Sequence, residues 1–265
     1  MLEVKNISVD TKNKKILDNF SLQLNQKQII GLTGQSGSGK TTLIRAIMGF
    51  LSRECSLTSG SIILDGKELT NLSFNKRREL CGTTIGYIPQ SPMTSFDPRL
   101  KIGEQMIETL KVRLKKKLEE CKILALEALD MVNLTDGKRV MESIPAQLSG
   151  GMLQRVAMAL LISMKPKYIL ADEPTSALDI ENRDLLLKLL KLLKEECTSA
   201  GILFISHDVE SMLKLCETVI VLEHGRSIEQ GSMAELLTSP KQLWTKTFAK
   251  SYSNLEREEW SWREL

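Results

Sequence analysis

Apolar and polar residues alternate along much of the N-terminal part of the chain. Residues 2–9 and 16–24 show the two-residue period that is typical of half-exposed strands. The segment GSIILDGKEL at 60–69 continues with a strand pattern, an Asp-Gly turn and a second strand pattern. Together these segments predict a small antiparallel β layer.

Short, continuous apolar runs further along the chain predict buried strands. Residues 168–172 and 201–206 form two such runs, and the helix-like segment 182–196 separates them. Because strand, helix and strand in this order form a parallel unit, the pattern predicts an α/β fold with a parallel sheet. The strand-like runs at 85–90 and 217–225 fit the same fold. Ligands of such sheets bind beyond the carboxyl ends of the strands, so the residues after each run are candidates for a site.

A helical block is predicted in the middle of the chain. Helical spacing of apolar residues extends over 99–135 and 152–164, and the segment SIPAQLSGG interrupts it. The basic run KVRLKKKLEECK at 111–122 falls within this block. Since no aromatic residues are interleaved with its charges, a solvated helix face is favoured over a nucleic-acid-binding patch.

The composition of the 265 residues changes this picture little. Hydrophobic residues make up 42% of the chain, enough for a packed core, and a net charge of +3 gives no argument for a nucleic acid partner. The five cysteines have no Cys-x-x-Cys spacing, so we expect reduced thiols in a cytosolic protein and no metal cluster. The N-terminus lacks a secretory pattern, and no run approaches the roughly 18 apolar residues of a membrane span. We therefore expect no membrane-spanning segment.

The segment GQSGSGKTT at 34–42 carries the clearest chemistry in the sequence. It fits the pattern Gly-x-x-x-x-Gly-Lys-Ser/Thr and lies between the strand-like QIIGLT and the helix-like TTLIRAIMGFL. An ordinary glycine-rich turn is the alternative, but both flanking elements favour a phosphate loop. Backbone N–H groups of such a loop surround phosphate oxygens, Lys40 reaches the outer phosphates and the Thr41 hydroxyl ligates Mg²⁺. The predicted nucleoside-triphosphate-binding residues of the loop are Gly34, Gln35, Ser36, Gly37, Ser38, Gly39, Lys40, Thr41 and Thr42.

Polar residues stand at the ends of three predicted strands: Asp172 with Glu173, Gln90, and His207. Each alone would more often be a surface or capping residue, but their joint position at strand ends favours a site. Hydrolysis of a phosphate needs a metal, a group that acts on water and a contact to the γ-phosphate. Asp172, Glu173 and His207 can fill these roles, which makes Glu173 and His207 the candidate catalytic residues.

Six motifs in order make the sequence similar to the ATP-binding subunits of ATP-binding cassette (ABC) transporters, from Gly34 through His207 and into the following strand. They are GQSGSGKTT as the Walker A loop, Gln90 as the Q-loop glutamine, LSGGM as the signature motif, YILADE as the Walker B strand, SALD at 176–179 as the D-loop, and His207 as the switch histidine. The resemblance implies ATP binding, to which Gln90 contributes, with Mg²⁺ as the cofactor. It also implies that Thr41, Gln90 and Asp172 hold the metal.

For the fold, the resemblance implies a P-loop NTPase of the ABC nucleotide-binding type. Such a domain has a RecA-like parallel sheet core, an antiparallel β subdomain and an inserted helical subdomain. We expect the ATPase domain at 1–240, its helical subdomain at approximately 92–165, and a C-terminal helical tail at 241–265. The tail has no family role, and Trp260 and Trp262 fit a core or subunit anchor and a frayed end equally well.

Two subunits of this family hold two ATP molecules head to tail between them. The resemblance therefore implies that Ser149, Gly150, Gly151 and Asp179 act on the ATP held by the partner's phosphate loop. A serine hydroxyl, glycine N–H groups and a helix beginning near Met152 suit that task. A simple helix N-cap is compatible with this interpretation, because the same N–H groups serve both.

By resemblance the chain is an ATP hydrolase that drives import through a separate permease. QSPMTSFDP and SGGMLQR resemble the nickel, metallophore and oligopeptide branch, and the lack of cysteine after Cys216 favours nickel or metal chelates over peptides. The implied partners are a second, different ATPase subunit, two integral membrane permease subunits and, indirectly, an extracytoplasmic substrate-binding protein, without nucleic acid. The implied location is peripheral, on the cytoplasmic face of the cell membrane. A soluble cassette ATPase that clamps nucleic acid or ribosomes is the alternative.

Two features depart from the family pattern. Met152 replaces the glutamine that usually closes the signature, a form found in nickel-type subunits. Family members usually stack adenine on an aromatic residue about thirty positions before the phosphate-loop lysine. Here that region reads SVDTKNKK and the first aromatic residue is Phe20, so the sequence identifies no adenine-stacking residue.

Overall fold

The structure, a computed structural model, describes residues 1–176, 178–197 and 199–263, without the side chains of 196–197 and of the residues from 254 onward. Ala177 of the SALD motif and the side chains of Trp260 and Trp262 therefore lie outside the described part. The chain forms two units. Unit 1 comprises Met1–Leu24, Ile29–Asn71 and Phe204–Leu265, and unit 2 comprises Asn25–Gln28 and Leu72–Leu203.

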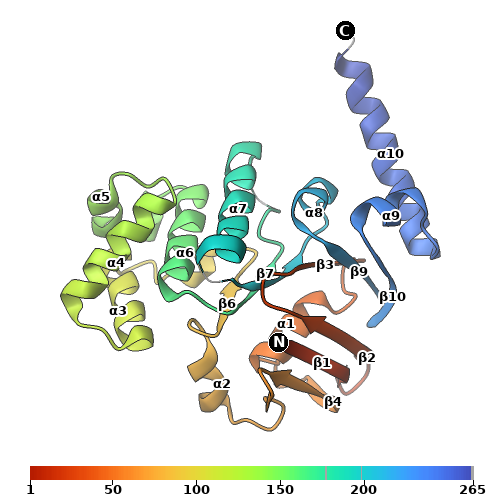
Figure 1. The fold of residues 1–265 in the computed structure, drawn as a ribbon, viewed down its shortest axis with the longest axis horizontal. Coiled ribbons are helices and arrows are strands. Elements are labelled where there is room, and N and C mark those ends of the chain that lie inside the picture. Colours follow the sequence, from red (N-terminus) through yellow and green to blue (C-terminus); the bar gives the residue numbers. More distant parts are fainter. Residues whose placement is uncertain (177, 198, 264–265) are drawn as a thin grey trace. The chain divides into compact units, whose positions relative to one another are not determined.

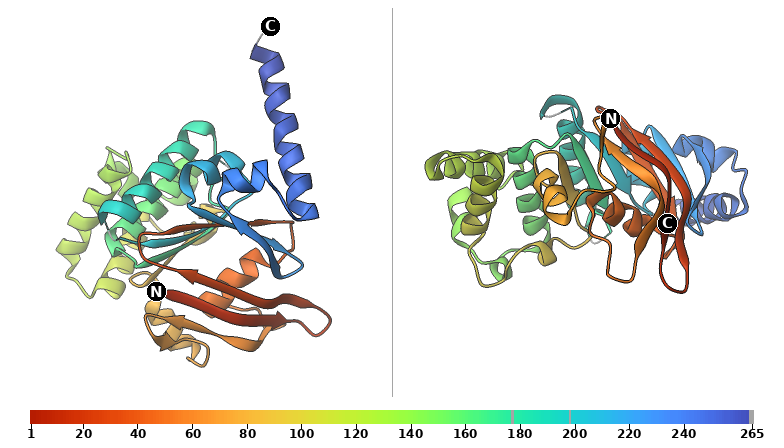
Figure 2. Two further views of the ribbon diagram at one scale, coloured as in Figure 1. Left: turned by 45° about the vertical axis from the view of Figure 1, so that its right-hand side comes forward. Right: turned by 90° about the horizontal axis from the view of Figure 1, so that it is seen from below.

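Unit 1 contains the antiparallel layer that the alternating pattern predicts (Figure 1). Its strands, in the order β2-β1-β4-β5, are β1 (Leu2–Asp10), β2 (Lys15–Leu24), β4 (Ser56–Leu64) and β5 (Lys67–Glu68). Leu2 of β1 pairs with Leu24 on one side and Leu64 on the other, and all three side chains are buried. The red and orange strands of this sheet lie side by side in Figure 2. Strand β4 begins at Ser56, earlier than the predicted start at Gly60.

The buried strand β3 (Ile29–Gly34) leads into the glycine loop of unit 1. All of its residues are buried, and it runs parallel to β9 (Thr218–Glu223). Strand β9 turns back into β10 (Arg226–Gly231), which pairs with it antiparallel. The helices of unit 1 are α1 (Lys40–Met48), α8 (Val209–Leu215), α9 (Met233–Thr238) and α10 (Leu243–Arg263). Helix α1 thus starts where the glycine loop ends, as the sequence predicts.

In unit 2, β6 (Ile85–Ile88) and β7 (Tyr168–Asp172) pair in parallel. Strand β8 (Gly201–Ile205) is the other neighbour of β7, and its residues from Phe204 belong to unit 1. Every residue of β7 and β8 is buried, as their continuous apolar sequences predict. The α/β fold with a parallel sheet is therefore confirmed.

The helices of unit 2 include the predicted central block. They are α2 (Phe74–Leu80), α3 (Ile102–Leu114), α4 (Leu118–Met131), α5 (Gly137–Glu142), α6 (Gly150–Met164) and α7 (Ile180–Leu192), with short 3₁₀ turns at Pro92–Ser95 and Pro145–Gln147 and a π turn at Leu193–Cys197. Helices α3, α4, α5 and α6 lie together in Figure 1. The pattern over 99–135 proves to be two helices, because Lys115 ends α3 in a left-handed conformation with φ of 54°.

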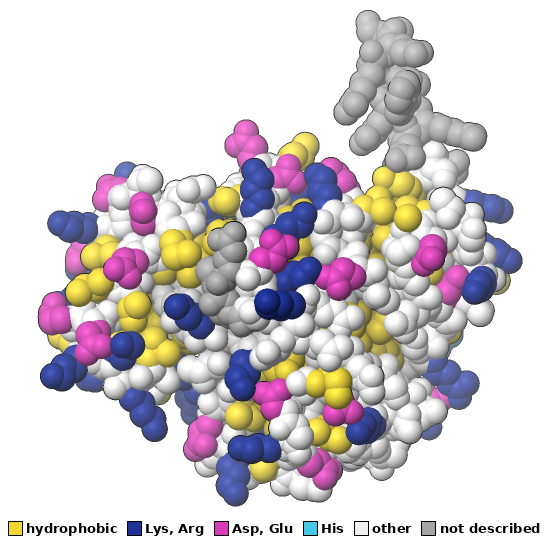
Figure 3. Space-filling model, viewed as in Figure 1, with side chains coloured by type: hydrophobic (Ala, Val, Ile, Leu, Met, Phe, Trp, Pro, Cys, Tyr) yellow, Lys and Arg dark blue, Asp and Glu magenta, His cyan; other side chains and the backbone are white. Residues whose placement is uncertain are grey.

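Charged side chains of both signs are interspersed on the face shown in Figure 3. Lysine and arginine side chains alternate there with aspartate and glutamate. Among the described helices, none combines the length and the apolar character that crossing a bilayer requires.

Candidate functional site

The glycines of the phosphate loop in unit 1 are required by the surrounding chain. Gly34 has φ of 145°, and a Cβ there would lie 2.0 Å from the carbonyl oxygen of Leu222. Gly39 has φ of 110°, and a Cβ there would lie 2.8 Å from Leu17 and 2.9 Å from the Ile16 carbonyl oxygen. Neither position can hold a side chain without moving backbone. The loop therefore presents bare backbone to its surroundings.

Lys40, the first residue of α1, turns its ammonium group back onto the loop. Its Nζ donates to the carbonyl oxygens of Gly34 at 2.8 Å and Gln35 at 3.0 Å, and the side chain is buried. Gly39 caps α1 without a side-chain acceptor, and the first turn contains no acidic residue. A positive charge, a helix start without a side-chain cap and the helix dipole thus meet at one point, which suits an anion.

The turn between β9 and β10, distant in sequence, forms backbone hydrogen bonds with the phosphate loop and with β2. The Gly225 N–H donates to the Ser38 carbonyl oxygen at 3.1 Å, and the Asp18 N–H donates to the Gly225 carbonyl oxygen at 3.0 Å. Arg226 Nε donates to Asp18 Oδ2 at 2.6 Å, and this side-chain hydrogen bond is the main reason why the pKa of Asp18 is lowered. The sequence did not predict this contact, although a glycine after an apolar run is a turn signal.

In unit 2 the structure brings Gln90 and Glu173 together. Gln90 Nε2 donates to Glu173 Oε2 at 3.4 Å, although 83 positions separate the two residues. Gln90 was predicted as the last residue of its strand but lies two positions beyond the end of β6, and His207 lies one position further from β8 than predicted. His207 in unit 1 is exposed.

Glu173 has an unusual backbone conformation. Its φ of 47° is left-handed, which costs a residue other than glycine about 1–3 kcal/mol. The N–H and hydroxyl of Ser176 both donate to the Glu173 carbonyl oxygen, at 3.2 and 3.0 Å, and fix the turn. Asp172, the preceding residue, is a buried carboxylate at the end of β7. Backbone strain of this kind is concentrated at functional sites.

The signature segment begins a helix two residues earlier than predicted. Helix α6 starts at Gly150 rather than near Met152, and Ser149 caps it by accepting the Met152 N–H at 3.2 Å. Both glycines thus lie in its first turn. Asp179 caps α7 in the same way and accepts the Asn182 N–H, which lowers the pKa of Asp179. Both segments present the exposed start of a helix.

The predicted metal ligands suit Mg²⁺. Thr41, Asp172 and Gln90 offer only hydroxyl, carboxylate and amide oxygens, the ligands that Mg²⁺ prefers. The described residues contain no group of three histidine, cysteine or acidic side chains able to hold a metal ion by themselves. Mg²⁺ is commonly bound by one or two protein oxygens together with nucleotide phosphates. In addition, Ser38 Oγ in the loop is buried without a hydrogen-bond partner among the described atoms, as expected for a loop that receives a polar ligand.

A buried strand, a glycine loop, an inward-turned lysine and a helix define a phosphate-loop nucleotide-binding protein of the α/β class. The family model described as ABC transporter matches residues 17–176. The chain belongs to this family, and it is an ATP hydrolase of the importer type.

Relatives of similar sequence are ATP-binding subunits of import systems. CntD of Staphylococcus aureus strain Mu50, the metal-staphylopine import system ATP-binding protein, is 36% identical over 93% of this chain and 91% of its own length. The dipeptide transport ATP-binding protein DppD of Haemophilus influenzae is 34% identical over 95% of this chain and 77% of its own. The oligopeptide transport ATP-binding protein OppD of Lactococcus lactis is 34% identical over 97% and 77%.

Solved structures agree with this assignment. The ATP-binding cassette MJ0796, in a dimeric post-hydrolysis state bound to ADP and Pi, has a TM-score of 0.77 and 28% identity, covering 88% of this chain and 99% of that one. The protein cbiO1 from Clostridium perfringens, part of the ABC transporter complex cbiONQ, has a TM-score of 0.75 and 25% identity over 90% of both chains. The fold is therefore that of an ABC ATPase.

Proposed function

We propose that the chain hydrolyses ATP to drive uptake of nickel, a metal chelate or oligopeptides through a separate permease. The relatives named above serve metal-staphylopine, dipeptide and oligopeptide import, and their likeness extends over nearly the whole chain. The metal-chelate relative is matched over 91% of its length and the two peptide relatives over 77%, which supports the metal-chelate side. The same relatives do not favour a switch that acts on nucleic acid or ribosomes.

The observation that carries ATP hydrolysis is the preformed phosphate loop with Lys40 bonded to its carbonyl oxygens. Lys40 would exchange these bonds for contacts to the outer phosphates, while loop N–H groups surround the phosphate oxygens. Mg²⁺ would be held by Thr41, Asp172 and Gln90, and it supplies charge neutralisation to the phosphates. Glu173 would orient and deprotonate the attacking water, and His207 would contact the γ-phosphate.

A second set of groups is proposed to act on the ATP of a partner subunit. A Cβ at Gly150 would meet no described atom within 4 Å, and Gly150 does not have a positive φ. Neither its conformation nor a neighbouring atom in the described chain thus requires a glycine at position 150. A group from outside the chain that approaches this position closely is a better explanation for the glycine. Ser149, Gly150, Gly151 and Asp179 would face this external ATP, and the similar cassette MJ0796 is dimeric in its solved structures.

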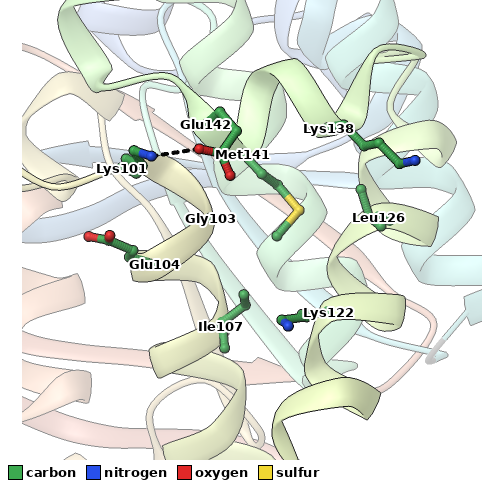
Figure 4. Close-up of a pocket in the computed structure, with 9 residues that line it drawn as sticks. All are labelled: Lys101, Gly103, Glu104, Ile107, Lys122, Leu126, Lys138, Met141 and Glu142. Carbon is green, nitrogen blue, oxygen red and sulfur yellow. Dashed lines mark hydrogen bonds and ion pairs between the residues drawn. The ribbon is translucent and has the colours of Figure 1, made fainter.

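A pocket of about 460 Å³ in unit 2 is the proposed docking site for the permease (Figure 4). It is lined by Lys101, Gly103, Glu104 and Ile107 from α3 and its cap, Lys122 and Leu126 from α4, and Lys138, Met141 and Glu142 from α5. Apolar groups alternate with charged groups around it, and Lys101 pairs with Glu142 across 2.6 Å. Such a surface suits an amphipathic helix, whose apolar face enters the groove while its polar face meets the charged rim.

The proposed assembly follows from this surface and from the family. It contains a second, different ATPase subunit and two permease subunits, and it receives cargo from an extracytoplasmic binding protein. The chain would then lie peripherally on the cytoplasmic face of the membrane. The proposal also assigns the ATPase domain to residues 1–240, its helical subdomain to approximately 92–165, and a C-terminal helical tail to 241–265.

A pull-down from native membranes tests the assembly. The wild-type chain should recover integral membrane proteins, and Ile107→Lys, which places a charge in the pocket, should recover far less. Ile123→Lys is the matched control, because Ile123 is 57% exposed on α4 and does not line the pocket. Recovery of ribosomal proteins or nucleic acid in place of a permease would contradict the proposal.

A further inference from the structure

The side chain of Asn182, in the first turn of α7, lies close to Gly151 at the start of α6. A Cβ at Gly151 would lie 2.9 Å from Asn182 Nδ2 and 3.0 Å from its Cγ and Oδ1. The φ of Gly151 is not positive, so its backbone conformation is open to any residue. The close approach of the Asn182 amide is therefore what excludes a side chain at position 151.

Asn182 cannot swing away freely to admit such a side chain. Its backbone N–H donates to Asp179 Oδ1 and its Nδ2 donates to Asp179 Oδ2, each at 2.8 Å. Rotation of the amide would break the second bond, and a charge-assisted hydrogen bond is stronger than a neutral one. The Asn182 side chain thus lies between the Asp179 carboxylate, to which it donates a hydrogen bond, and Gly151, which it approaches closely.

A second contact joins the same two segments. Gln154, buried on α6, donates from Nε2 to the carbonyl oxygen of Pro174 at 3.3 Å. Pro174 directly follows Glu173 in sequence. One hydrogen bond and one close approach therefore connect the start of α6 with the segment that runs from the end of β7 into α7.

We propose that Asn182 is a positioning residue that sets Asp179 and the signature turn at Gly151 in a fixed relation. The inference deepens the proposed function, since it takes these two elements to face the ATP of the partner subunit. Asn182 itself touches no nucleotide in this scheme. It acts by keeping two groups, contributed by different helices, at the spacing that one ATP requires.

The contact is tested first on the full chain alone. Asn182→Ala should raise the pKa of Asp179, because a hydrogen bond to its charged form is lost, and carboxyl NMR titration measures this. Gly151→Ala should lower the Tm of the otherwise wild-type chain. In the Asn182→Ala background, where the methyl group has space, the same substitution should cause less than about half of that decrease in Tm. Independent, additive losses would overturn the contact, and with it the proposal.

The positioning role is tested on the complex recovered from membranes. Asn182→Ala should reduce kcat for ATP about tenfold with little change in KM, and ATP affinity of the isolated chain should stay within about twofold. Glu181→Ala, an exposed neighbour in the same turn, is the matched control and should leave all three unchanged.

The outcomes separate this inference from the proposed function. An unchanged kcat in Asn182→Ala, together with a strong loss in Ser149→Arg, would overturn the positioning role alone. An unchanged kcat in both variants would overturn the action on the partner's ATP. If Asn182→Ala lowers the affinity of the isolated chain for its own ATP, the residue acts on that nucleotide rather than on the partner's ATP, and the inference is also overturned.

Discussion

The phosphate loop and the signature loop both place glycines at the start of a helix, but different surroundings constrain them. In the phosphate loop, Gly34 and Gly39 have positive φ, and the atoms that exclude a side chain there include backbone atoms of the same chain. In the signature loop, the three atoms nearest to a Cβ added at Gly151 belong to the Asn182 side chain, and a Cβ added at Gly150 would meet no described atom within 4 Å. The first loop is shaped by its own fold, whereas the second leaves space for something outside the chain.

The first turns of α1 and α6 also differ in how they are capped. Gly39 has no side chain that could cap α1, a helix start of the kind that binds phosphate oxygens. Ser149 accepts the Met152 N–H, which stabilises α6 without any ligand and leaves the serine hydroxyl proton to donate elsewhere. A glycine motif therefore shows where the backbone is exposed. The residue that caps the helix shows whether the N–H groups of the first turn have a hydrogen-bond acceptor in the absence of a ligand.

The largest effect should come from the phosphate loop. Lys40→Ala removes the charge that would meet the β- and γ-phosphates, so we expect loss of most ATP affinity and of all transport. Calorimetry with ATP measures the first and uptake by the reconstituted complex the second. Circular dichroism serves as the control for folding. Unchanged affinity would show that the loop does not bind nucleotide through this lysine.

Glu173→Gln should separate binding from chemistry. The amide keeps the size of the side chain but cannot take a proton from water, so ATP should stay bound while hydrolysis slows about a hundredfold or more. Steady-state phosphate release and ATP retention on a filter measure the two. Hydrolysis at the wild-type rate would assign the action on water to another residue.

Ser149→Arg should damage the site of the partner. This chain's own ATP affinity should remain nearly intact, because its phosphate loop is untouched. The loss of one γ-phosphate donor typically costs about 3 kcal/mol of transition-state stabilisation, and the bulky side chain would also hinder closure. Nucleotide trapping with a distinguishable label on each subunit locates the defect. Loss of ATP binding by the isolated chain would mean that the signature acts on its own nucleotide.

Alanine substitution compares the glycines directly through the stability of the isolated chain. Gly34→Ala should lower the free energy of unfolding by roughly 3 kcal/mol or more, since the methyl group collides with the Leu222 carbonyl oxygen. Gly150→Ala should change it by about 1 kcal/mol or less, with gain favoured by helix propensity. Urea denaturation measures both. Equal losses would remove the distinction between the two loops.

The smallest effect concerns pH and the turn behind the phosphate loop. The Arg226 hydrogen bond lowers the pKa of Asp18 in the folded state, so the pair contributes stability that is complete above the unfolded pKa of about 3.9. This contribution is lost as the pH falls through the lower, folded pKa. The difference in unfolding free energy between wild type and Asp18→Asn should therefore shrink below about pH 4. A difference that grows with acidity would contradict the ion pair.

The sequence was most informative where local pattern and burial coincide. The apolar run YILAD predicted a buried strand, and the phosphate loop was identified by its own flanking elements. The start of α6 was misplaced because glycine is a poor helix former, whereas the Ser149 cap decides where the helix begins. The roles of Gly225 and Asn182 depend on contacts between distant or differently oriented segments, which no local pattern contains.

The left-handed backbone at Glu173 bears on how the proposed catalytic carboxylate is retained during evolution. A glycine would occupy φ of 47° with less strain, so folding alone would not select glutamate there. Variants that relax this turn are therefore expected to gain stability while losing turnover, a trade-off common at enzyme active sites. Laboratory selection for heat resistance alone would then erode the carboxylate, and only selection for transport would retain it.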